Sequence, residues 1–342
     1  MKRKLAAFIS LAVAAMMLAT GCGSGTASST KTQASGSAAT QTAQQQSSSG
    51  AKKVTIGTGG TTGTYYAIGG VMATVLNPKL KLSNLTVTST GASKANIQMV
   101  EDGEADLATV QNDVMYYANK GTDLFKDEGA YSGFSAVAGL YDETCQIIAT
   151  GDIKSVADLK GKTVSVGDAG SGVEFNARQI LEAYGLTFDD IKVVNASFGD
   201  SADSIKDGKI DAAFVVAGAP TTAVTDLSTT KAINIVSIDS EHADKLIAKY
   251  PFYTKTTIKS GTYKGVDTDV DTVSVRATLI ASNKLSEDAV YELTKVLFEN
   301  KQELVSGHAK FEELSLDNAL KGIDVPIHPG AQKYYKEKGI VK

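Results

Sequence analysis

The sequence has few of the residues on which metal centres and aromatic binding platforms depend. Its 342 residues include 2 Cys, 3 His and no Trp, and 7% of them are aromatic. A zinc cluster draws about four ligands from Cys and His, and a groove for nucleic-acid strands stacks bases on aromatic rings. The formal net charge of −4 also lacks the basic excess of a nucleic-acid surface. These absences argue against a metal centre and a nucleic-acid partner, and they leave a slightly acidic α/β binding protein or a metal-free enzyme.

The N-terminus has the layout of a secretory signal. A basic start at Lys2–Lys4 precedes an apolar stretch over residues 5–19, which is too short for a comfortable membrane span and predicts a signal peptide over residues 1–21. The run Leu18-Ala19-Thr20-Gly21-Cys22 resembles a bacterial lipobox, where a peptidase cuts before a diacylated cysteine. We therefore expect a lipid on Cys22, and the alternative is an ordinary signal peptide with a chance cysteine.

A polar segment separates this signal from the rest of the chain. Residues 23–50 are almost only Ser, Thr, Gln, Ala and Gly, which predicts a flexible tether, because no large apolar side chain is present to bury. The protein is then expected outside the cytoplasm, anchored to the membrane by the lipid on Cys22. Cys145 would have no partner within the chain, so we expect a buried or semi-buried thiol. Residues 1–50 hold four basic residues and no acid, which leaves 30 basic residues (34 less four) against 38 acidic ones, a net charge of −8.

From residue 54 onward, short β-rich runs alternate with helical patterns. This alternation is typical of an α/β fold in which helices cover parallel strands. We expect strands at 54–57, 85–90, 106–110, 163–167, 192–194 and 211–216, and helices at 65–76, 92–101, 173–184 and 201–206. A single amphipathic helix is also expected over 286–305, as a cover for the sheet.

The two halves of this pattern resemble each other. Asp102-Gly103-Glu104-Ala105-Asp106 parallels Asp207-Gly208-Lys209-Ile210-Asp211, which favours two similar lobes over one continuous sheet. Long apolar runs at 136–150 and 272–282 are expected to cross between the lobes. Lobe 1 would then hold residues 51–140 and roughly 273–342, and lobe 2 roughly 141–272, with hinge strain near 140–145 and 272–276.

Five loops that follow the expected strands are rich in Gly, Thr, Ser, Asn and Gln. They lie at 58–64, 90–93, 111–113, 168–173 and 217–220. Ligands of open α/β sheets bind beyond the carboxyl ends of the strands, where backbone N–H groups and helix N-termini suit a small anion. Any one of these loops could be a simple turn, but five at one edge favour a binding site.

Three patterns that suggest an enzyme are each incomplete. Gly57-Thr58-Gly59 lacks the acid expected roughly 20 residues further on in a dinucleotide-binding unit, since the first acidic residue is Glu101. Gly161-Lys162-Thr163 lacks the first glycine of a phosphate-binding loop. Ala169 breaks the nucleophile motif around Ser171, and none of the histidines can be placed as its base. We therefore predict no enzymatic activity, no metal and no cofactor.

Ordered motifs occur along nearly all of residues 53–340. They are Ile56-Gly57-Thr58-Gly59-Gly60-Thr61 with Tyr65-Tyr66, Ala105-Asp106-Leu107-Ala108-Thr109-Val110-Gln111, Gly170-Ser171-Gly172 with Glu174 and Asn176, Tyr250-Pro251-Phe252-Tyr253, and His328-Pro329-Gly330-Ala331 with Tyr334-Tyr335. Together they resemble the TAXI family, the extracytoplasmic solute receptors of TRAP transporters.

The resemblance implies a two-lobed periplasmic-binding-protein fold, type II-like, that closes on a ligand in the cleft between its lobes. It also implies a small carboxylate ligand such as glutamate, glutamine or a related organic acid. The ligand would be delivered to a TRAP membrane permease, a fused multi-span subunit driven by an ion gradient. An extracytoplasmic sensor subunit that signals with the same clamshell is the alternative.

The motifs and the loops together predict the ligand contacts. These are Gly59, Gly60, Thr61, Thr62, Tyr65, Tyr66, Thr90, Gln111, Asn112, Ser171, Gly172, Val173, Asn176, Ala217, Gly218 and Pro220. Val173 stands where the resembled family often has Thr, so one hydroxyl near the ligand is replaced by an apolar side chain.

Overall fold

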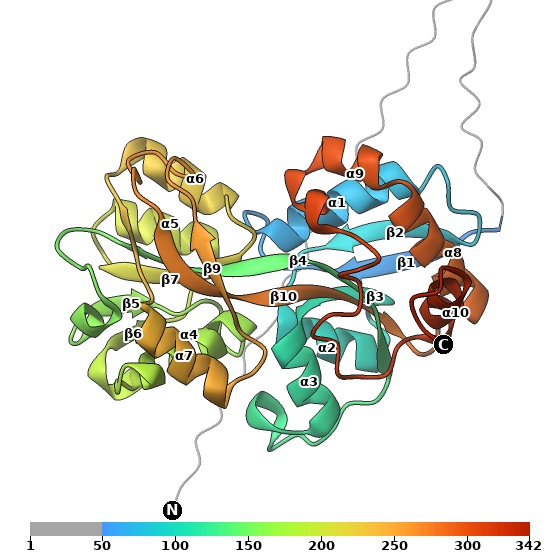
Figure 1. Ribbon diagram of the computed structural model, residues 1–342, viewed down its shortest axis with the longest axis horizontal. Coiled ribbons are helices and arrows are strands. Elements are labelled where there is room, and N and C mark those ends of the chain that lie inside the picture. Colours follow the sequence, from blue (N-terminus) through green and yellow to red (C-terminus); the bar gives the residue numbers. More distant parts are fainter. Residues whose placement is uncertain (1–49) are drawn as a thin grey trace, which may run out of the picture. The chain divides into compact units, whose positions relative to one another are not determined.

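The computed structural model describes residues 50–342 (Figure 1). The expected signal peptide, the lipid site at Cys22 and the tether up to residue 49 lie outside the described residues. None of the helices described between residues 50 and 342 has the length and apolar character needed to cross a membrane.

The described strands form one ten-stranded mixed sheet, which confirms the predicted α/β class. The strands are β1 (Lys52–Gly57), β2 (Ser83–Thr88), β3 (Leu107–Gln111), β4 (Phe134–Ala149), β5 (Thr163–Ser165), β6 (Lys192–Val194), β7 (Ala212–Ala217), β8 (Asn234–Val236), β9 (Thr254–Ile258) and β10 (Val270–Ser282). Their order is β2-β1-β3-β10-β4-β7-β5-β6, with β8 on β4 and β9 on β10. We call β2-β1-β3 the first half-sheet and β7-β5-β6 the second half-sheet; each is parallel within itself.

Helices cover both faces of each half-sheet. They are α1 (Thr64–Leu76), α2 (Ser93–Asp102), α3 (Asn112–Lys120), α4 (Gly172–Ala183), α5 (Phe198–Lys206), α6 (Thr222–Thr230), α7 (Ser240–Lys249), α8 (Glu287–Glu299), α9 (Lys301–Gly307) and α10 (Pro329–Glu337). On the first half-sheet, α1, α8 and α10 pack on one face and α2 and α3 on the other. On the second, α4 and α7 pack on one face and α5 and α6 on the other (Figure 1).

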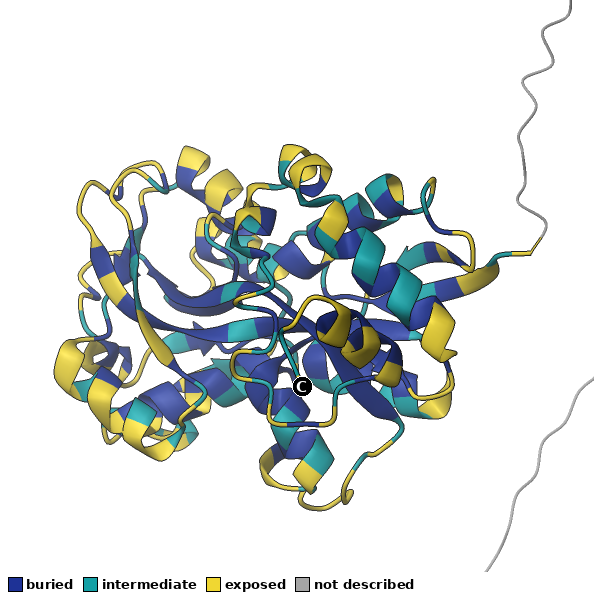
Figure 2. Ribbon diagram, turned by 45° about the vertical axis from the view of Figure 1, so that its right-hand side comes forward, coloured by how far each residue is buried: buried dark blue, intermediate teal, exposed yellow. Residues whose placement is uncertain are grey.

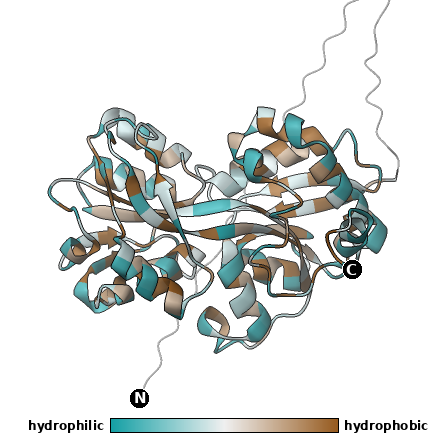
Figure 3. Ribbon diagram, in the orientation of Figure 1, coloured by the Kyte–Doolittle hydropathy of each residue, from teal (hydrophilic) through white to brown (hydrophobic). Residues whose placement is uncertain are grey.

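The alternation of side chains along each central strand explains this layering. In β7, Phe214 and Val216 belong to the core under α4 and α7, whereas Ala213 and Val215 belong to the core under α5 and α6. Successive strand residues point to opposite faces of a sheet, so a strand that is apolar throughout requires helices on both sides. Figure 2 shows the result, with buried strands inside and exposed residues on the outer faces of the helices, and hydropathy follows the same division (Figure 3).

Two long strands join the half-sheets. β4 has 16 residues and β10 has 13, so each spans about 40–50 Å at roughly 3.3 Å per residue. β4 pairs with β10 from Phe134 to Thr144 and with β7 from Thr144 to Ala149. The expected crossing strands are therefore present, but the expectation of lobes with separate sheets is wrong, because these strands carry one hydrogen-bonded ladder through both halves. The lobe boundaries and the hinge stay predictions.

The helix expected over 286–305 is interrupted. Ser286 accepts a hydrogen bond from the Ala289 N–H at 3.3 Å and caps α8, as its position at the start of the pattern suggests. The helix ends at Asn300, whose φ of −112° and ψ of 25° leave the helical region, and α9 follows at once. Leu293, Leu297 and Leu304 are nevertheless all buried in one core, so the periodicity predicted the buried face but not the break.

A buried polar network also connects α3 with α4. The Asn176 side-chain amide donates to Asp113 at 3.1 Å and to the Tyr253 hydroxyl at 2.6 Å. Tyr253 donates to Gln179 at 2.7 Å, and Gln179 donates to the Tyr117 hydroxyl at 3.2 Å. Burial raises the pKa of Asp113 to about 6. This network fixes the two half-sheets to each other at a second place, apart from β4 and β10.

A substitution at Gly330 can test how closely α10 packs on α8. A Cβ added there would lie 2.2 Å from the carbonyl oxygen of Glu287 and 2.6 Å from the amide nitrogen of Tyr291, both backbone atoms that cannot rotate away. We expect Gly330→Ala to lower the free energy of unfolding in urea by about 1–3 kcal/mol, the cost of overpacking. Gly70→Ala is the control, because a Cβ at this site in α1 has no neighbour within 4 Å, and it should be neutral or slightly stabilising. Equal losses in the two variants would contradict this account.

Asp113 should make stability depend on pH. Its folded pKa of about 6 lies above the unfolded value near 3.8, so its contribution is complete below the unfolded pKa and is lost as pH rises through 6. Relative to Asp113→Asn, the wild type should lose about 2 kcal/mol of unfolding free energy between about pH 4.5 and about pH 7.5. Urea unfolding of both proteins at the two pH values measures this, and parallel pH profiles would refute it.

Candidate functional site

A cavity lies where the carboxyl ends of the two half-sheets face each other. Its lining includes Gly59 and Gly60 after β1, Gln111 at the end of β3, Asp168 after β5 and Ala217 at the end of β7. It holds about 500 Å³ of space free of protein atoms, its mouth to solvent included. The loops that follow parallel strands meet at one edge of a sheet, and here two such edges are turned toward each other across β4.

Half of the predicted ligand contacts line this cavity. These are Gly59, Gly60, Tyr65, Gln111, Ser171, Gly172, Val173 and Ala217. They come from both half-sheets, so residues that are far apart in the chain are brought together as the loop argument expects. Whether they contact a ligand stays a prediction.

The other eight predicted contacts lie outside the lining, and four of them have structural partners. The Thr90 hydroxyl hydrogen-bonds the Thr58 carbonyl oxygen at 3.0 Å, and Asn176 belongs to the buried network between α3 and α4. Asn112 accepts from the Arg276 N–H at 2.9 Å, and the Gly218 carbonyl accepts from the Thr64 hydroxyl at 3.2 Å. The remaining four are Thr61, Thr62, Tyr66 and Pro220, of which Thr62 is partly buried and the others are exposed.

Buried side chains behind the cavity hold its walls in place. The Asn96 amide donates to the carbonyl oxygens of Thr58 at 2.6 Å and Thr109 at 2.7 Å, which ties the end of β1 to the end of β3. The Ser93 hydroxyl accepts from the Gln111 N–H at 3.1 Å. These bonds satisfy backbone groups at the strand ends, where the sheet ladder stops, and so they fix the loop geometry.

Four helices begin at the cavity. Thr64, Ser93, Gly172 and Phe198 are the first residues of α1, α2, α4 and α5, and all four line it. Neither α1 nor α2 has a capping side chain or an acidic residue in its first turn. The first N–H groups of a helix lack partners within the helix and carry partial positive charge, so this wall of the cavity offers donors to an anionic group.

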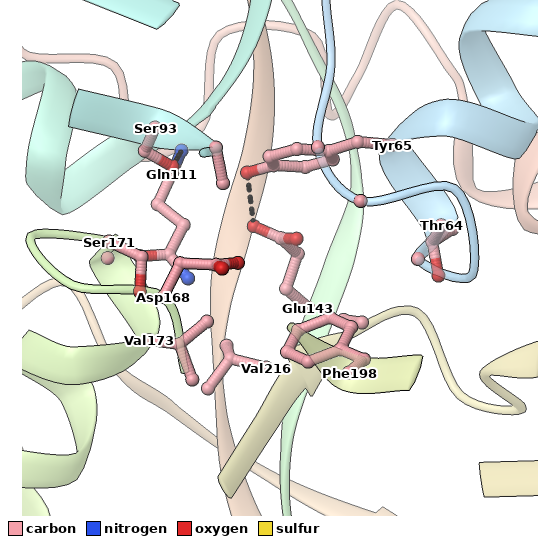
Figure 4. Close-up of a pocket in the computed structure, with 16 residues that line it drawn as sticks. Thr64, Tyr65, Ser93, Gln111, Glu143, Asp168, Ser171, Val173, Phe198 and Val216 are labelled. Atoms are coloured by element: carbon pink, nitrogen blue, oxygen red, sulfur yellow. Dashed lines mark hydrogen bonds between the residues drawn. The ribbon is translucent and has the colours of Figure 1, made fainter. Parts of the chain in front are cut away.

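Two acidic residues that the sequence reasoning missed also line the cavity. Glu143 lies on β4, is 2% exposed, and accepts a hydrogen bond from the Tyr65 hydroxyl at 2.7 Å. Burial raises its pKa well above the usual value, against the lowering effect of the Tyr65 bond. Asp168 is half-buried, and burial together with the nearby Asp200 raises its pKa. Figure 4 shows both carboxyl groups pointing into the space between the walls.

The signal for Glu143 was present in the sequence. It is an acidic residue within the long apolar run predicted to cross between lobes, a place where a charged side chain is costly to bury without a partner. The contacts predicted from the sequence come from the loops after the strands and from the ordered motifs, and Glu143 belongs to neither. Phe198, the first residue of α5, was also missed and forms an apolar wall together with Val173 and Val216.

The two sides of the site are in tight contact at one point. A Cβ added to Gly172 would lie 1.9 Å from Oε1 of Gln111 and 3.0 Å from a methyl group of Val114. The N-terminus of α4 therefore rests directly on the end of β3, and a larger residue at position 172 would require the Gln111 side chain to move. Oε1 of Gln111 is buried and has no hydrogen-bond partner.

The residues that could serve metal or nucleophilic chemistry have other roles. Among residues 50–342, no group of three or more His, Cys, Asp and Glu side chains is arranged to hold a metal ion. Cys145 is a buried free thiol, as expected. The Ser171 hydroxyl accepts the Glu174 N–H at 3.3 Å as the cap of α4, and His308 and His328 accept backbone N–H groups as helix caps.

Comparison with known proteins gives a family and several similar structures. Solved structures similar to the chain include the periplasmic aliphatic sulphonate binding protein SsuA from Escherichia coli (17% identity, 83% of each chain covered, TM-score 0.47). Another is a putative L-cystine ABC transporter from Listeria monocytogenes (14% identity, 78% of this chain and 98% of that chain, TM-score 0.48). A third is a binding protein component of an ABC phosphonate transporter from Pseudomonas aeruginosa (13% identity, 77% of this chain and 80% of that chain, TM-score 0.46). Residues 56–339 match the NMT1-like family, and the chain therefore belongs to that family.

Proposed function

We propose that the protein is an extracytoplasmic solute-binding receptor of a transporter, and that it holds a small ligand in the cavity between its half-sheets. The observation that carries this proposal is the convergence of four helix N-termini and two half-sheets on one cavity. Such an arrangement can bind a small polar molecule by backbone groups alone. The secretory layout of the first 50 residues supports a location outside the cytoplasm.

The finer proposal follows the sequence resemblance. The chain would serve a TRAP transporter of the TAXI type, anchored by a lipid on Cys22, and would deliver a small carboxylate such as glutamate or glutamine to its permease. Support comes from the resembling motifs themselves, because Gly59 and Gly60 of the first motif and Ser171 and Gly172 of a later one line the cavity. A carboxylate would accept from the uncapped N–H groups at the start of α1.

The contact between Gly172 and Gln111 supports a closing motion in the proposed receptor. It lies across the cavity from β4, so opening the half-sheets about β4 and β10 would separate it and admit a ligand. Hinge closure around a ligand is one established type of conformational change. In this proposal the same residues form the binding surface throughout. The protein alternates between an open form that takes up the ligand and a closed form that retains it.

Ligand binding gives the direct test of the proposed function. Thermal and urea unfolding should show stabilisation by L-glutamate, L-glutamine or 2-oxoglutarate at millimolar concentration. A ligand of micromolar affinity at about a thousand times its dissociation constant adds about 4 kcal/mol. Glycerol at the same concentration is the control for effects of added solute. The proposal fails if none of these carboxylates stabilises the protein more than glycerol does.

Gly172→Ala tests whether the contact of α4 with β3 belongs to the ligand-bound form. The added methyl group would collide with Gln111 and prevent the closest approach of the two sides. Overpacking costs about 1–3 kcal/mol, and each ~1.4 kcal/mol is tenfold in affinity, so calorimetry should show binding weakened about tenfold or more. Gly70→Ala, whose added methyl group meets no atom within 4 Å and which is outside the cavity lining, should bind as the wild type does. Unchanged affinity in Gly172→Ala would show that closure does not need this contact.

A further inference from the structure

The cavity offers two kinds of polar group. The helices α1 and α2 present first-turn N–H groups with no capping side chain. The lining also contains the carboxyl group of Glu143, hydrogen-bonded to Tyr65 of α1, and that of Asp168, which faces it (Figure 4). Among the described residues that line the cavity, none is Lys, Arg or His. A ligand that carried only negative charge would be attracted by the N–H groups and repelled by the carboxyl groups.

Glu143 has room for one more hydrogen-bond donor. The Tyr65 hydroxyl occupies Oε2 at 2.7 Å, which leaves Oε1 for a ligand. The charge of Lys310 acts on Glu143 and lowers its pKa, but the Lys310 ammonium group already donates to Glu313 at 2.7 Å. The cavity lining therefore holds a buried acid and no cation, a costly arrangement unless a ligand provides the partner.

We propose that Glu143 selects the ligand by accepting a hydrogen bond from a protonated amine, with Asp168 opposite it, so that the ligand is a zwitterion and not a plain dicarboxylate. The carboxylate of this ligand lies against the N-termini of α1 and α2, and its ammonium group lies against Glu143. The inference rests on the proposed function and narrows its ligand class. Burial without a cation favours the protonated form of Glu143, and an ammonium group brings back the charged form.

Plain dicarboxylates are disfavoured by the same geometry. A compound with the carbon skeleton of glutamate but no amine leaves Oε1 of Glu143 without a donor, and its second carboxylate approaches two acidic side chains. Specificity is a difference of affinities, and an unpaired buried acceptor is an effective way to reject the wrong ligand. The sequence alone, read for anion-binding loops, gave no reason to separate these two classes.

The test compares ligands that differ in the amine. Calorimetric titration would use L-glutamate and L-glutamine against glutarate and 2-oxoglutarate, with the wild type and with Glu143→Gln. A hydrogen bond to a charged group contributes about 1.5–3 kcal/mol, which converts to about 10- to 100-fold in affinity. The wild type should bind at least one amine-bearing ligand about tenfold or more tightly than the ligand without it. Glu143→Gln should lose about 10- to 100-fold for the amine-bearing ligand and should not weaken the binding of glutarate.

A neighbouring carboxyl group provides the matched control. Asp142 is next to Glu143 on β4 but points to the opposite face, where it pairs with Arg276 at 2.7 Å. Asp142→Asn removes a carboxylate from the same strand without touching the cavity lining, so ligand affinity and preference should stay those of the wild type. Thermal unfolding of each variant shows whether it is folded.

The outcomes separate the two proposals. Binding of glutarate or 2-oxoglutarate as tightly as the amine-bearing ligands, or an equal loss for both classes in Glu143→Gln, overturns the role of Glu143 and leaves the solute receptor standing. Failure of all four compounds to bind the wild type overturns the proposed ligand class together with this inference. A loss confined to the amine-bearing ligands in Glu143→Gln, absent from Asp142→Asn, supports it.

Discussion

The pairing of β4 with β10 is the constraint on which the rest of the structure depends. These two antiparallel strands lie between the half-sheets, with β10 paired to β3 and β4 paired to β7, and every other strand is placed on one side of them or the other. At Thr144 the pairing of β4 passes from β10 to β7. Glu143 precedes this point, at the level where the loops of both half-sheets converge. The position of the cavity, and of the acid within it, therefore follows from where one long strand changes its partner.

Polar groups are concentrated where the half-sheets meet. Asp113, Glu143 and Asn176 are each almost fully buried there, although burial of a polar group costs free energy unless it is hydrogen-bonded. Oδ1 of Asp113 and Oδ1 of Asn176 in the α3–α4 network have no hydrogen-bond partner, and neither has Oε1 of Gln111. Glu143 accepts from Tyr65 through one of its two carboxyl oxygens. What distinguishes the site from the network is that Glu143 and Gln111 line the cavity, whereas Asp113 and Asn176 do not. Groups with perturbed pKa and unmet hydrogen-bonding capacity, lining a cavity, are typical of functional residues.

Much of the secondary structure could be predicted because it is locally encoded. The alternation of apolar runs and loops predicted β1, β6 and β7 to within two residues at either end, and the helical periodicity after Ser286 predicted the buried face of α8. The helix break at Asn300 was missed, because that face continues unchanged into α9. In the site, Gly59 and Ser171 were predicted from turn chemistry beside strand ends, but Asn176 lies in a structural network. A side chain on a helix has several possible neighbours, and only packing selects among them.

The sequence by itself determined which segments are strands, which are helices, and which strand ends carry loops able to bind an anion. It did so because period-two and period-3.6 patterns, glycines and caps act over a few residues. Only the tertiary structure decided that the two halves share one sheet, that Gly172 touches Gln111, and that Glu143 faces the same cavity as the helix N-termini. These depend on strand pairs such as Glu143 with Val275. No rule of sequence spacing predicts the pairing of residues so far apart in the chain, because their contact depends on how the helices pack on both faces of the sheet.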